Sequence, residues 1–209
     1  MEKTAKTILA IGSHPDDIEF GCGGTLIRLA AQCCKTFLLI LTDGSAGGDP
    51  IVRQREQNAS LKALGAKKVF WGGYSDTHLP FYQDVISSIE RVVKEVVPTH
   101  VFVHHGKDTH QDHRHVTTCS VAATRNVPNV LFYEGPTAYD FEPNVFVDIG
   151  GCLQQKFKGL SCHKSQVKKT NINDQSILDI ARATAIFRGT QCRIPFAEAF
   201  CSLRMFLTI

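Results

Sequence analysis

The sequence predicts a single α/β domain built on a doubly wound, mostly parallel β-sheet. Short apolar runs alternate with longer stretches of helical spacing, which is the pattern of β-α units. Several apolar runs are continuous rather than alternating, as in strands that are covered on both faces. The chain has 209 residues, 43% of them hydrophobic, which suits one domain with a sizeable core. We find no linker, repeat or low-complexity segment, so we expect one domain over residues 1–209.

The elements of the first two thirds follow from this alternation. Continuous apolar runs predict strands over residues 7–11, 36–41, 69–71, 101–103 and 130–133. Helical spacing predicts helices from about residue 23 to residue 30, and over residues 51–64, 81–97 and 116–123. Pro98 ends the third of these helices, because proline cannot continue a helix interior. A loop rich in Gly and Asp separates the second strand from the second helix.

The last third of the chain is less regular. A further strand is expected over residues 145–149, and helices over residues 152–162 and 174–188. Apolar and polar residues alternate over residues 199–206, which predicts a strand at the edge of the sheet.

Composition and charge narrow the functional classes. The formal net charge is +3 and no basic stripe is interleaved with aromatic residues, so a nucleic-acid partner is not expected. No stretch approaches the roughly 20 apolar residues of a membrane span. Residues 1–6 lack the apolar core and the cleavage site of a signal peptide. We therefore expect a cytoplasmic protein whose eight cysteines are buried thiols rather than disulfide partners or metal ligands.

Two short segments carry more imidazole and carboxylate groups than one metal ion needs. The first, SHPDDIE, covers residues 13–19, and the second, DTHQDHRH, covers residues 108–115. They follow the first and the fourth predicted strands. In the common strand order 3-2-1-4-5 these two strands are neighbours, and ligands bind beyond their carboxyl ends. This order would bring His14, Asp17 and His113 to one crevice.

The residue types favour a hydrolytic metal site over a structural one. A structural zinc site uses all its ligands, whereas zinc hydrolases supply three protein ligands and add acid–base groups. Asp16 and Asp17 are adjacent, so we expect one to bind the metal and its neighbour to accept a proton. Of His110 and His113, one can bind the metal while the other faces the substrate. Asp112 orients a histidine or caps the following helix.

The glycines after the first segment do not indicate a nucleotide site. Gly21, Gly23 and Gly24 lack the spacing of a dinucleotide-binding loop. The His-Pro-Asp-Asp segment also stands where that loop would be. A dinucleotide-binding function is therefore not expected.

These segments resemble the signatures of the PIG-L/LmbE-like zinc-dependent N-deacetylase family. Residues 13–25 resemble its first signature and residues 110–116 its second. Three further segments show a weaker similarity: residues 53–65, 163–166 and 197–200. Ser13 and Gln111 stand where Ala and Pro are usual in this family, and neither change removes a ligand or an acid–base group.

The resemblance implies a Rossmann-like fold and roles for six residues of the two segments and for Arg53. Zn²⁺ would be bound by His14, Asp17 and His113. Asp16 would be the general base that activates the water molecule. His110, with Asp112 as its partner, would stabilise the oxyanion or protonate the leaving amine. Arg53 would be a substrate contact.

The resemblance also implies an enzyme that removes the N-acetyl group from an amino sugar or an amino-sugar conjugate and releases acetate. Fe²⁺ or another divalent metal could replace zinc, and a homo-oligomer is compatible with the family. Two other functions remain open: a metal-dependent hydrolase of a phosphoester or of another amide, and a non-catalytic, metal-stabilised sugar-binding module. One ligand cluster instead of two argues against two-metal phosphoester chemistry. The surplus acid–base groups argue against the binding module.

Overall fold

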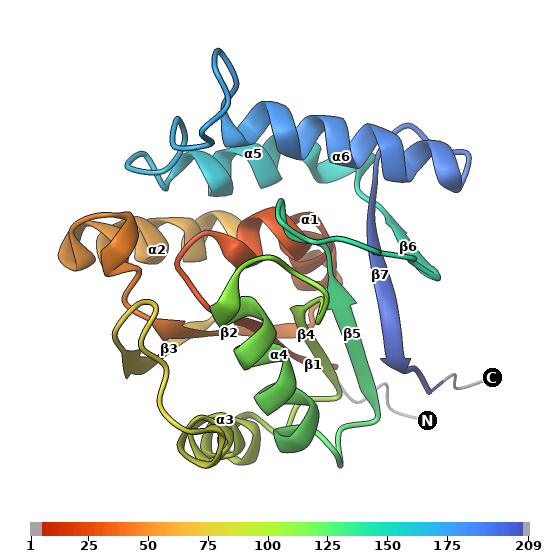
Figure 1. Ribbon diagram of the computed structural model, residues 1–209. Helices are drawn as coiled ribbons and strands as arrows, with labels where there is room; N and C mark the ends of the chain where they lie inside the picture. Colours follow the sequence, from red (N-terminus) through yellow and green to blue (C-terminus); the bar gives the residue numbers. More distant parts are fainter. Residues whose placement is uncertain (1–5, 207–209) are drawn as a thin grey trace.

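The computed structural model describes residues 6–206. Residues 1–5 and 207–209 lie outside the described part, and so does most of the N-terminal segment in which the sequence shows no signal peptide. Within the described part, seven strands form one sheet in the order β3-β2-β1-β4-β5-β7-β6 (Figure 1). They are β1 (Thr7–Gly12), β2 (Lys35–Thr42), β3 (Lys68–Tyr74), β4 (His100–His104), β5 (Asn129–Tyr133), β6 (Val145–Asp148) and β7 (Ala197–Arg204).

The first five strands are parallel to one another, and helices connect them. The helices are α1 (Asp17–Ala31), α2 (Pro50–Leu64), α3 (Tyr82–Val96), α4 (Gln111–Ala123), α5 (Leu153–Ser161) and α6 (Ile177–Gln191). Two short 3-10 turns are η1 (Ser45–Gly47) and η2 (Gly150–Cys152). The parallel pairing of β1 with both β2 and β4 confirms the predicted doubly wound α/β sheet and its strand order.

Helices cover both faces of the sheet. In Figure 1, α3 and α4 lie below the sheet, and α1, α2, α5 and α6 lie above it. Successive residues of β1 enter different cores, because side chains of a strand alternate between the two faces. Ile8 and Ala10 pack in the core under α1, whereas Leu9 and Ile11 pack in the core over α3 and α4. The burial of β1 on both faces explains its continuous apolar sequence.

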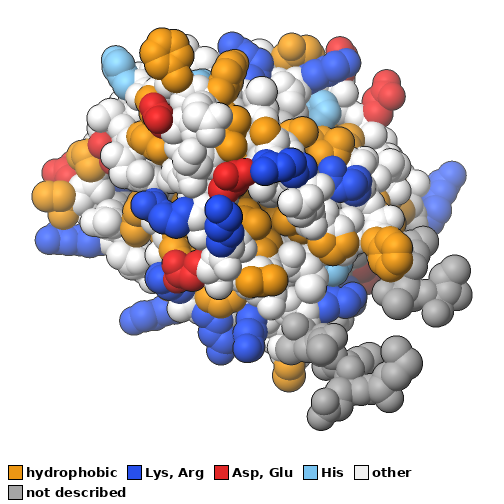
Figure 2. Space-filling view, turned by 90° about the horizontal axis from the view of Figure 1, so that it is seen from below, with side chains coloured by type: hydrophobic (Ala, Val, Ile, Leu, Met, Phe, Trp, Pro, Cys, Tyr) orange, Lys and Arg blue, Asp and Glu red, His pale blue; other side chains and the backbone are white. Residues whose placement is uncertain are grey.

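The face formed by α3 and α4 is mixed in character. Figure 2 shows Lys and Arg side chains there, interspersed with apolar and acidic side chains. In the part of the chain that the structure describes, no helix combines the length and the apolar character that crossing a membrane would require. All eight cysteines are free thiols. Burial is confirmed for Cys22, Cys34, Cys119 and Cys152, but the expectation of a buried thiol is wrong for the exposed Cys33 and for the partly exposed Cys162, Cys192 and Cys201.

The prediction of an edge strand over residues 199–206 is wrong. β7 lies between β5 and β6 and runs antiparallel to both. The four residues of β6 pair only with Ala197–Phe200, so Cys201–Arg204 have a partner on the β5 side alone. The second half of β7, which is hydrogen-bonded to β5 alone, explains the alternating sequence. The strand at the edge of the sheet is the short β6.

Two helices begin earlier than the sequence suggests. Helix α1 begins at Asp17. The glycines in its first half hide the start of the helix in the sequence, because glycine has a low helix propensity. Gly21 allows α1 to approach β5, since a Cβ at this position would lie 2.1 Å from the ring of Tyr133. Helix α4 begins at Gln111, with His110 as its N-cap, so the polar second segment is largely helical rather than a loop.

A buried ion pair joins the C-terminal elements to α1. Lys156 of α5 lies 2.5 Å from Glu198 of β7, and both are buried. Glu198 also accepts hydrogen bonds from the backbone amides of Gly24 and Thr25 at 2.8 and 2.7 Å. Lys156 donates a further bond to the carbonyl of Phe20 at 2.5 Å. The weakly similar segment 197–200 thus packs against the helix that follows the first motif.

Candidate active site

The two predicted segments meet in one pocket at the carboxyl ends of the central strands. The pocket has a volume of about 550 Å³, within the usual range for small-molecule sites. Its floor contains His14, Asp16 and Asp17 from the first segment and His110 and His113 from the second. The remaining lining residues come from the loops after β2, β3 and β5, from α1 and α2, and from α5, α6 and the chain between them: Phe20, Ala46, Gly47, Arg53, Asp76, Pro136, Thr137, Leu160, Gln166, Lys169, Thr170, Asn171, Ile177 and Ile180.

The backbone of Asp16 separates two adjacent carboxylates. Asp16 has φ 102° and ψ −24°, a left-handed conformation that non-glycine residues rarely adopt and that is common at functional sites. Its carboxylate lies 3.3 Å from Arg53, whereas the carboxylate of Asp17 faces the histidines. The two adjacent carboxylates therefore have different neighbours, a guanidinium for Asp16 and imidazoles for Asp17.

Asp17 contacts three histidines. Its Oδ2 lies 3.3 Å from His14 Nδ1 and 3.2 Å from His104 Nε2, and its Oδ1 lies 3.4 Å from His113 Nε2. Burial alone would raise the pKa of this carboxyl group. The three imidazoles outweigh burial and hold the pKa of Asp17 well below its usual range. Asp17 is therefore ionised at neutral pH.

His14 is surrounded by carboxylates. Its Nε2 lies 2.9 Å from Asp76 Oδ1 and 3.2 Å from Asp112 Oδ2. Burial would lower the pKa of His14, but Asp17, Asp112 and Asp76 together hold it well above its ordinary value. The carboxylates thus favour the protonated, positively charged form of His14. A bound metal ion would supply positive charge at the same place.

His110 and His113 stack with ring centroids 4.6 Å apart. The backbone N–H of Asp112 donates to His110 Nδ1 at 3.2 Å, so the proton of neutral His110 lies on Nε2. Burial, followed by the charges of His14 and His113, lowers the pKa of His110, so the ring is neutral at neutral pH. Nε2 of His110 can therefore donate a hydrogen bond.

Asp112 departs from the partnership with His110 that the resemblance implies. Its carboxylate accepts a hydrogen bond from the backbone N–H of Thr77 at 2.9 Å and contacts His14. Only its backbone amide bonds to His110. Asp112 is also not the helix cap, because His110 holds that position and Asp112 lies in the first turn of α4. The carboxylate prefers His14 because α4 starts early and turns this side chain toward the first segment.

Arg53 contacts the protein's own groups. Its guanidinium lies 3.3 Å from Asp16 Oδ2 and donates to the carbonyls of Gly44, at 3.1 Å, and Pro15. Burial raises the pKa of Asp16 to about 6, Asp17 pushes it in the same direction, and Arg53 opposes both. Asp16 thus has a pKa close to neutral pH, as general bases often do.

The sequence reasoning assigned no role to Asp76 and Asp108. It placed His104 at the end of the fourth strand, near the site, and expected it to support the ligands or the fold rather than bind the metal. Asp76 follows β3 and is 6% exposed, and Asp108 begins the second segment and is 1% exposed. His104 ends β4 and stacks on His113 at 3.9 Å, and burial together with His113 lowers its pKa to about 4. The available signal was position, because the three residues lie at or after the ends of strands whose carboxyl ends share one edge of the sheet.

Other histidines lie outside this pocket. His78 is exposed in the loop after β3, His105 packs edge-on against Phe141, and His115 packs against Tyr82 with its ring tilted. His163 is buried 3.5 Å from Glu19 and is not among the residues that line the pocket. These four residues do not enlarge the cluster.

The cluster offers donors that suit a divalent metal. Among the described residues, three groups place one donor atom of each member within 4.8 Å of the others: His14, His110 and His113; Asp17, His104 and His113; and His14, Asp76 and Asp112. The predicted set of His14, Asp17 and His113 is not one of these groups, although Asp17 contacts both histidines. All these donors are imidazole nitrogens or carboxylate oxygens, which Zn²⁺ and Fe²⁺ both accept.

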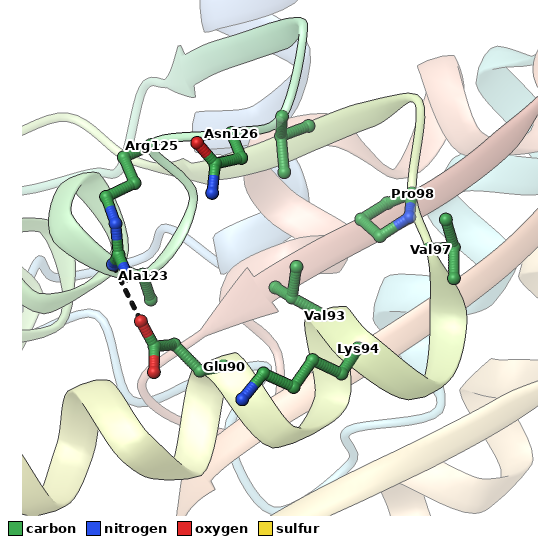
Figure 3. Close-up of a pocket in the computed structure, with 9 residues that line it drawn as sticks. Glu90, Val93, Lys94, Val97, Pro98, Ala123, Arg125 and Asn126 are labelled. Atoms are coloured by element: carbon green, nitrogen blue, oxygen red, sulfur yellow. Dashed lines mark hydrogen bonds and ion pairs between the residues drawn. The ribbon is translucent and has the colours of Figure 1, made fainter.

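A second cleft lies away from this chemistry. It opens between the end of α3 and the end of α4, where Val93, Val97 and Pro98 face Arg125 and Asn126 (Figure 3). An ion pair of 2.7 Å between Arg125 and Glu90 crosses one end. The cleft contains no histidine or cysteine and only one carboxylate, so it lacks the groups for hydrolysis.

The family relation of the chain is shown by comparison with known proteins. The model of the PIG-L family, described as GlcNAc-PI de-N-acetylase, matches residues 9–124. An uncharacterised deacetylase, YaiS of Escherichia coli strain K12, is 38% identical over 170 residues, which cover 77% of this chain and 91% of that protein. Diacetylchitobiose deacetylase of Thermococcus kodakarensis is 30% identical over 192 residues, covering 77% of this chain and 70% of that protein.

The fold agrees with this relation. The crystal structure of N,N'-diacetylchitobiose deacetylase from Pyrococcus horikoshii, in complex with its inhibitor MPG, superposes with a TM-score of 0.83. The sequences are 25% identical, and the match covers 96% of this chain and 85% of that one. The predicted resemblance is confirmed, and the chain belongs to the PIG-L family of deacetylases.

Proposed function

We propose that this protein is a metal-dependent hydrolase that removes the N-acetyl group from an amino sugar or an amino-sugar conjugate and releases acetate. The observation that carries the proposal is the position of Asp16. A carboxylate with a pKa of about 6 adjoins the ionised Asp17 and its histidines in one open pocket. A site for sugar binding alone would have no use for this acid–base group.

His14, Asp17 and His113 are the proposed metal ligands, with Zn²⁺ as the proposed metal and Fe²⁺ as the alternative. The surplus of negative charge around His14 supports this choice, because a divalent cation would neutralise it. When bound, Zn²⁺ lowers the pKa of water from 15.7 toward about 7 and polarises an amide carbonyl.

The chain's own residues then move protons and hold charge. Asp16, mostly ionised at pH 7 with its pKa of about 6, accepts the proton of the attacking water. The ring of His110 packs against that of His14, with ring centroids 4.7 Å apart, and its Nε2–H can donate to the oxyanion or to the leaving amine. Asp112 and Asp76 hold His14 in place.

The walls of the pocket suit a sugar conjugate. The lining combines the polar side chains of Gln166, Lys169 and Asn171 with the apolar side chains of Phe20 and Ile180. Sugars bind through this combination of hydrogen-bonding groups and apolar faces. The relatives that act on diacetylchitobiose support an amino-sugar substrate.

We also make a proposal about the cellular compartment of the protein and about its domain organisation. Eight free thiols suit a reducing compartment such as the cytoplasm. We further propose that residues 1–209 form a single deacetylase domain.

The direct test is a panel of N-acetylated amino sugars and their conjugates, incubated with Zn²⁺-loaded protein and assayed for acetate. Release of acetate from an amino sugar supports the proposal. Hydrolysis of only non-sugar amides would make the protein a different amide hydrolase. Binding of the sugars without any acetate release would contradict the enzymatic function.

The role of Asp16 is tested by Asp16→Asn, which keeps the size of the side chain and removes the base. We expect kcat to fall by at least about 100-fold, which is the lower range for loss of a general base. Zinc content, measured by atomic absorption, should stay at the wild-type level because Asp17 remains. Asp174→Asn serves as the control, since Asp174 is exposed and also has a positive φ of 61°. Normal turnover of the Asp16 variant with zinc retained would rule out Asp16 as the base.

A further inference from the structure

A buried carboxylate stands behind His113, on the side opposite Asp17. Asp108 Oδ2 lies 2.9 Å from His113 Nδ1, while His113 Nε2 faces Asp17 Oδ1 at 3.4 Å. Asp108 is 1% exposed and His113 is 5% exposed. Each nitrogen of the imidazole therefore has its own carboxylate, and only Nε2 points toward the other candidate ligands.

The second oxygen of Asp108 is already occupied by two donors. Oδ1 accepts a hydrogen bond from the backbone N–H of His110 at 2.8 Å and another from Thr137 Oγ1 at 2.6 Å. A backbone N–H can only donate, so the atom at the Oδ1 position must be an acceptor. One carboxylate thus bonds to the ring of His113 and to the backbone of His110, which caps α4.

The segment that carries Asp108 is itself held in place. Asp108 pairs with Ala138 in an isolated antiparallel bridge, and the N–H of Thr109 donates to the carbonyl of Thr137 at 3.1 Å. Arg114 donates to the carbonyl of Asp108 at 2.7 Å. These bonds fix the carboxylate relative to α4 and to the chain after β5, so its position does not depend on His113.

We propose that Asp108 is a positioning residue that fixes the tautomer and the ring orientation of His113, with the proton on Nδ1 and the lone pair of Nε2 directed to the metal. The inference rests on the metal site proposed above. A metal-binding histidine commonly donates its other N–H to a carboxylate, and loss of that partner typically weakens metal binding or activity by about 10- to 100-fold.

The surrounding donors determine what Asp108→Asn would do. The amide oxygen of asparagine must occupy the Oδ1 position to accept from His110, which places the amide nitrogen opposite His113 Nδ1. An N–H donor there forces His113 Nδ1 to accept, so the proton of the neutral ring moves to Nε2. That proton then points at the metal position and must be lost before the ring can bind a metal.

The test compares metal affinity in Asp108→Asn and in the wild type. Zn²⁺ and Co²⁺ dissociation constants are measured by competition with a chelator, and the visible spectrum of the Co²⁺ form reports the ligand geometry. We expect about 10- to 100-fold weaker binding and an altered Co²⁺ spectrum in the variant. Asp140→Asn is the matched control, because Asp140 is exposed, contacts only Lys107 at 3.5 Å and should bind metal as the wild type does.

A second measurement needs no variant. Long-range ¹H–¹⁵N spectra of the Zn²⁺-loaded wild type should show His113 protonated at Nδ1 and unprotonated at Nε2. A His113 that carries its proton on Nε2 would overturn the proposal, even if Asp108→Asn failed to fold. An Asp108→Asn protein with the wild-type circular dichroism spectrum and unchanged metal affinity would also overturn it, while leaving the metal site intact. A wild type that binds neither Zn²⁺ nor Co²⁺ would overturn the metal site and this role together.

Discussion

Asp16 shows how a single residue combines backbone strain with charge control. Its left-handed backbone is held by two bonds, from its own N–H to Gln57 Oε1 at 3.3 Å and from the Phe20 N–H to its carbonyl at 3.1 Å. The strain is compensated by these contacts and turns the carboxylate from the histidines toward Arg53. Burial raises the pKa of Asp16, and the positive charge of Arg53 limits this increase.

This dependence predicts the effect of Arg53→Met, which keeps the apolar stem and removes the charge. A neighbouring arginine typically lowers the pKa of an aspartate by about 1–3 units. Without it the pKa of Asp16 rises above about 6, so the base is protonated over more of the neutral range and activity is lost at a higher pH. The acidic limb of kcat/KM against pH should therefore move up by about one unit.

The control for this prediction is Arg55→Met, an exposed position two residues along the same helix. Its pH profile should match the wild type. If Arg53→Met instead raises KM and leaves the acidic limb in place, Arg53 is a substrate contact, as the family resemblance implies, and does not tune Asp16.

At the scale of elements, the contact between α1 and β5 shows why a glycine-rich stretch can be helical. A Cβ at Gly21 would lie 2.1 Å from Tyr133 Cδ2, and the Tyr133 hydroxyl is fixed by a bond of 2.8 Å to the carbonyl of Ile11. The ring cannot move aside without losing that bond. Close packing of α1 on the sheet, and with it the position of Asp17 at the start of α1, therefore depends on the missing side chain.

We predict that Gly21→Ala destabilises the protein by about 1–3 kcal/mol, the usual cost of overpacking a core. Helix propensity alone would give the opposite sign, since alanine favours a helix by about 1 kcal/mol over glycine. Gly23→Ala on the same helix is the control, because its Cβ would meet Leu64 at an ordinary 3.4 Å. Urea unfolding should show Gly21→Ala less stable than the wild type and Gly23→Ala at least as stable.

The elements also show where sequence reasoning succeeds and where it stops. Continuous apolar runs and the switch-point rule were enough for β1 to β5 and their order, because burial on both faces leaves a strong pattern. The position of β7 could not be predicted in this way. Its second half pairs with one strand only, so apolar and polar residues alternate there as they do in an edge strand. The starts of α1 and α4 were hidden because glycine and histidine are poor local signals for a helix that tertiary contacts stabilise.

For the candidate site, proximity of the two segments was predictable, but the pairing of their side chains was not. The approach of Asp17 to His14 and His113 follows from strand order and motif position. The contact of Asp112 with His14 instead of His110 depends on the first turn of α4, which the sequence pattern did not reveal. Asp76 joins the cluster only through topology, because it is far from either segment along the chain. His104 ends the strand that precedes the second segment.

At the scale of the whole molecule, a buried charge pair links the helix after the first motif to the chain after α5. His163 and Glu19 are both buried, 3.5 Å apart. Burial opposes both charges, yet Glu19 raises the pKa of His163 above 6.5, and His163 lowers the pKa of Glu19 below 4.5. Gln57 and Ser60 also donate to Glu19, at 2.7 and 2.6 Å. The pair thus joins α1, α2 and the C-terminal third.

This pair predicts a defined pH dependence of stability. The raised pKa of His163 stabilises the fold fully below pH 6.5, and the contribution is lost as the pH rises through the folded-state pKa. The lowered pKa of Glu19 stabilises the fold above pH 4.5 and is lost as the pH falls through its folded-state value. The destabilisation caused by His163→Gln should therefore be greatest between about pH 4.5 and 6.5 and smaller at pH 9.

Urea unfolding of both proteins in the presence of a chelator would measure this difference without a metal contribution. His100→Gln is the control, because His100 is half-buried at the start of β4 and burial lowers rather than raises its pKa. A difference between wild type and His163→Gln that grows from pH 6 to pH 9 would contradict the charge pair.

The ion pair between Lys156 and Glu198 has a consequence for the order of folding during synthesis. Glu198 accepts a hydrogen bond from the amide of Thr25, which precedes it by 173 residues. The ribosome therefore completes α1 long before it adds Glu198. A nascent chain that has emerged only as far as α6 must leave the ammonium group of Lys156 without its counter-ion. We therefore expect the N-terminal βα units to remain loosely packed on the ribosome, and the pocket to assume its final shape only after β7 has been released.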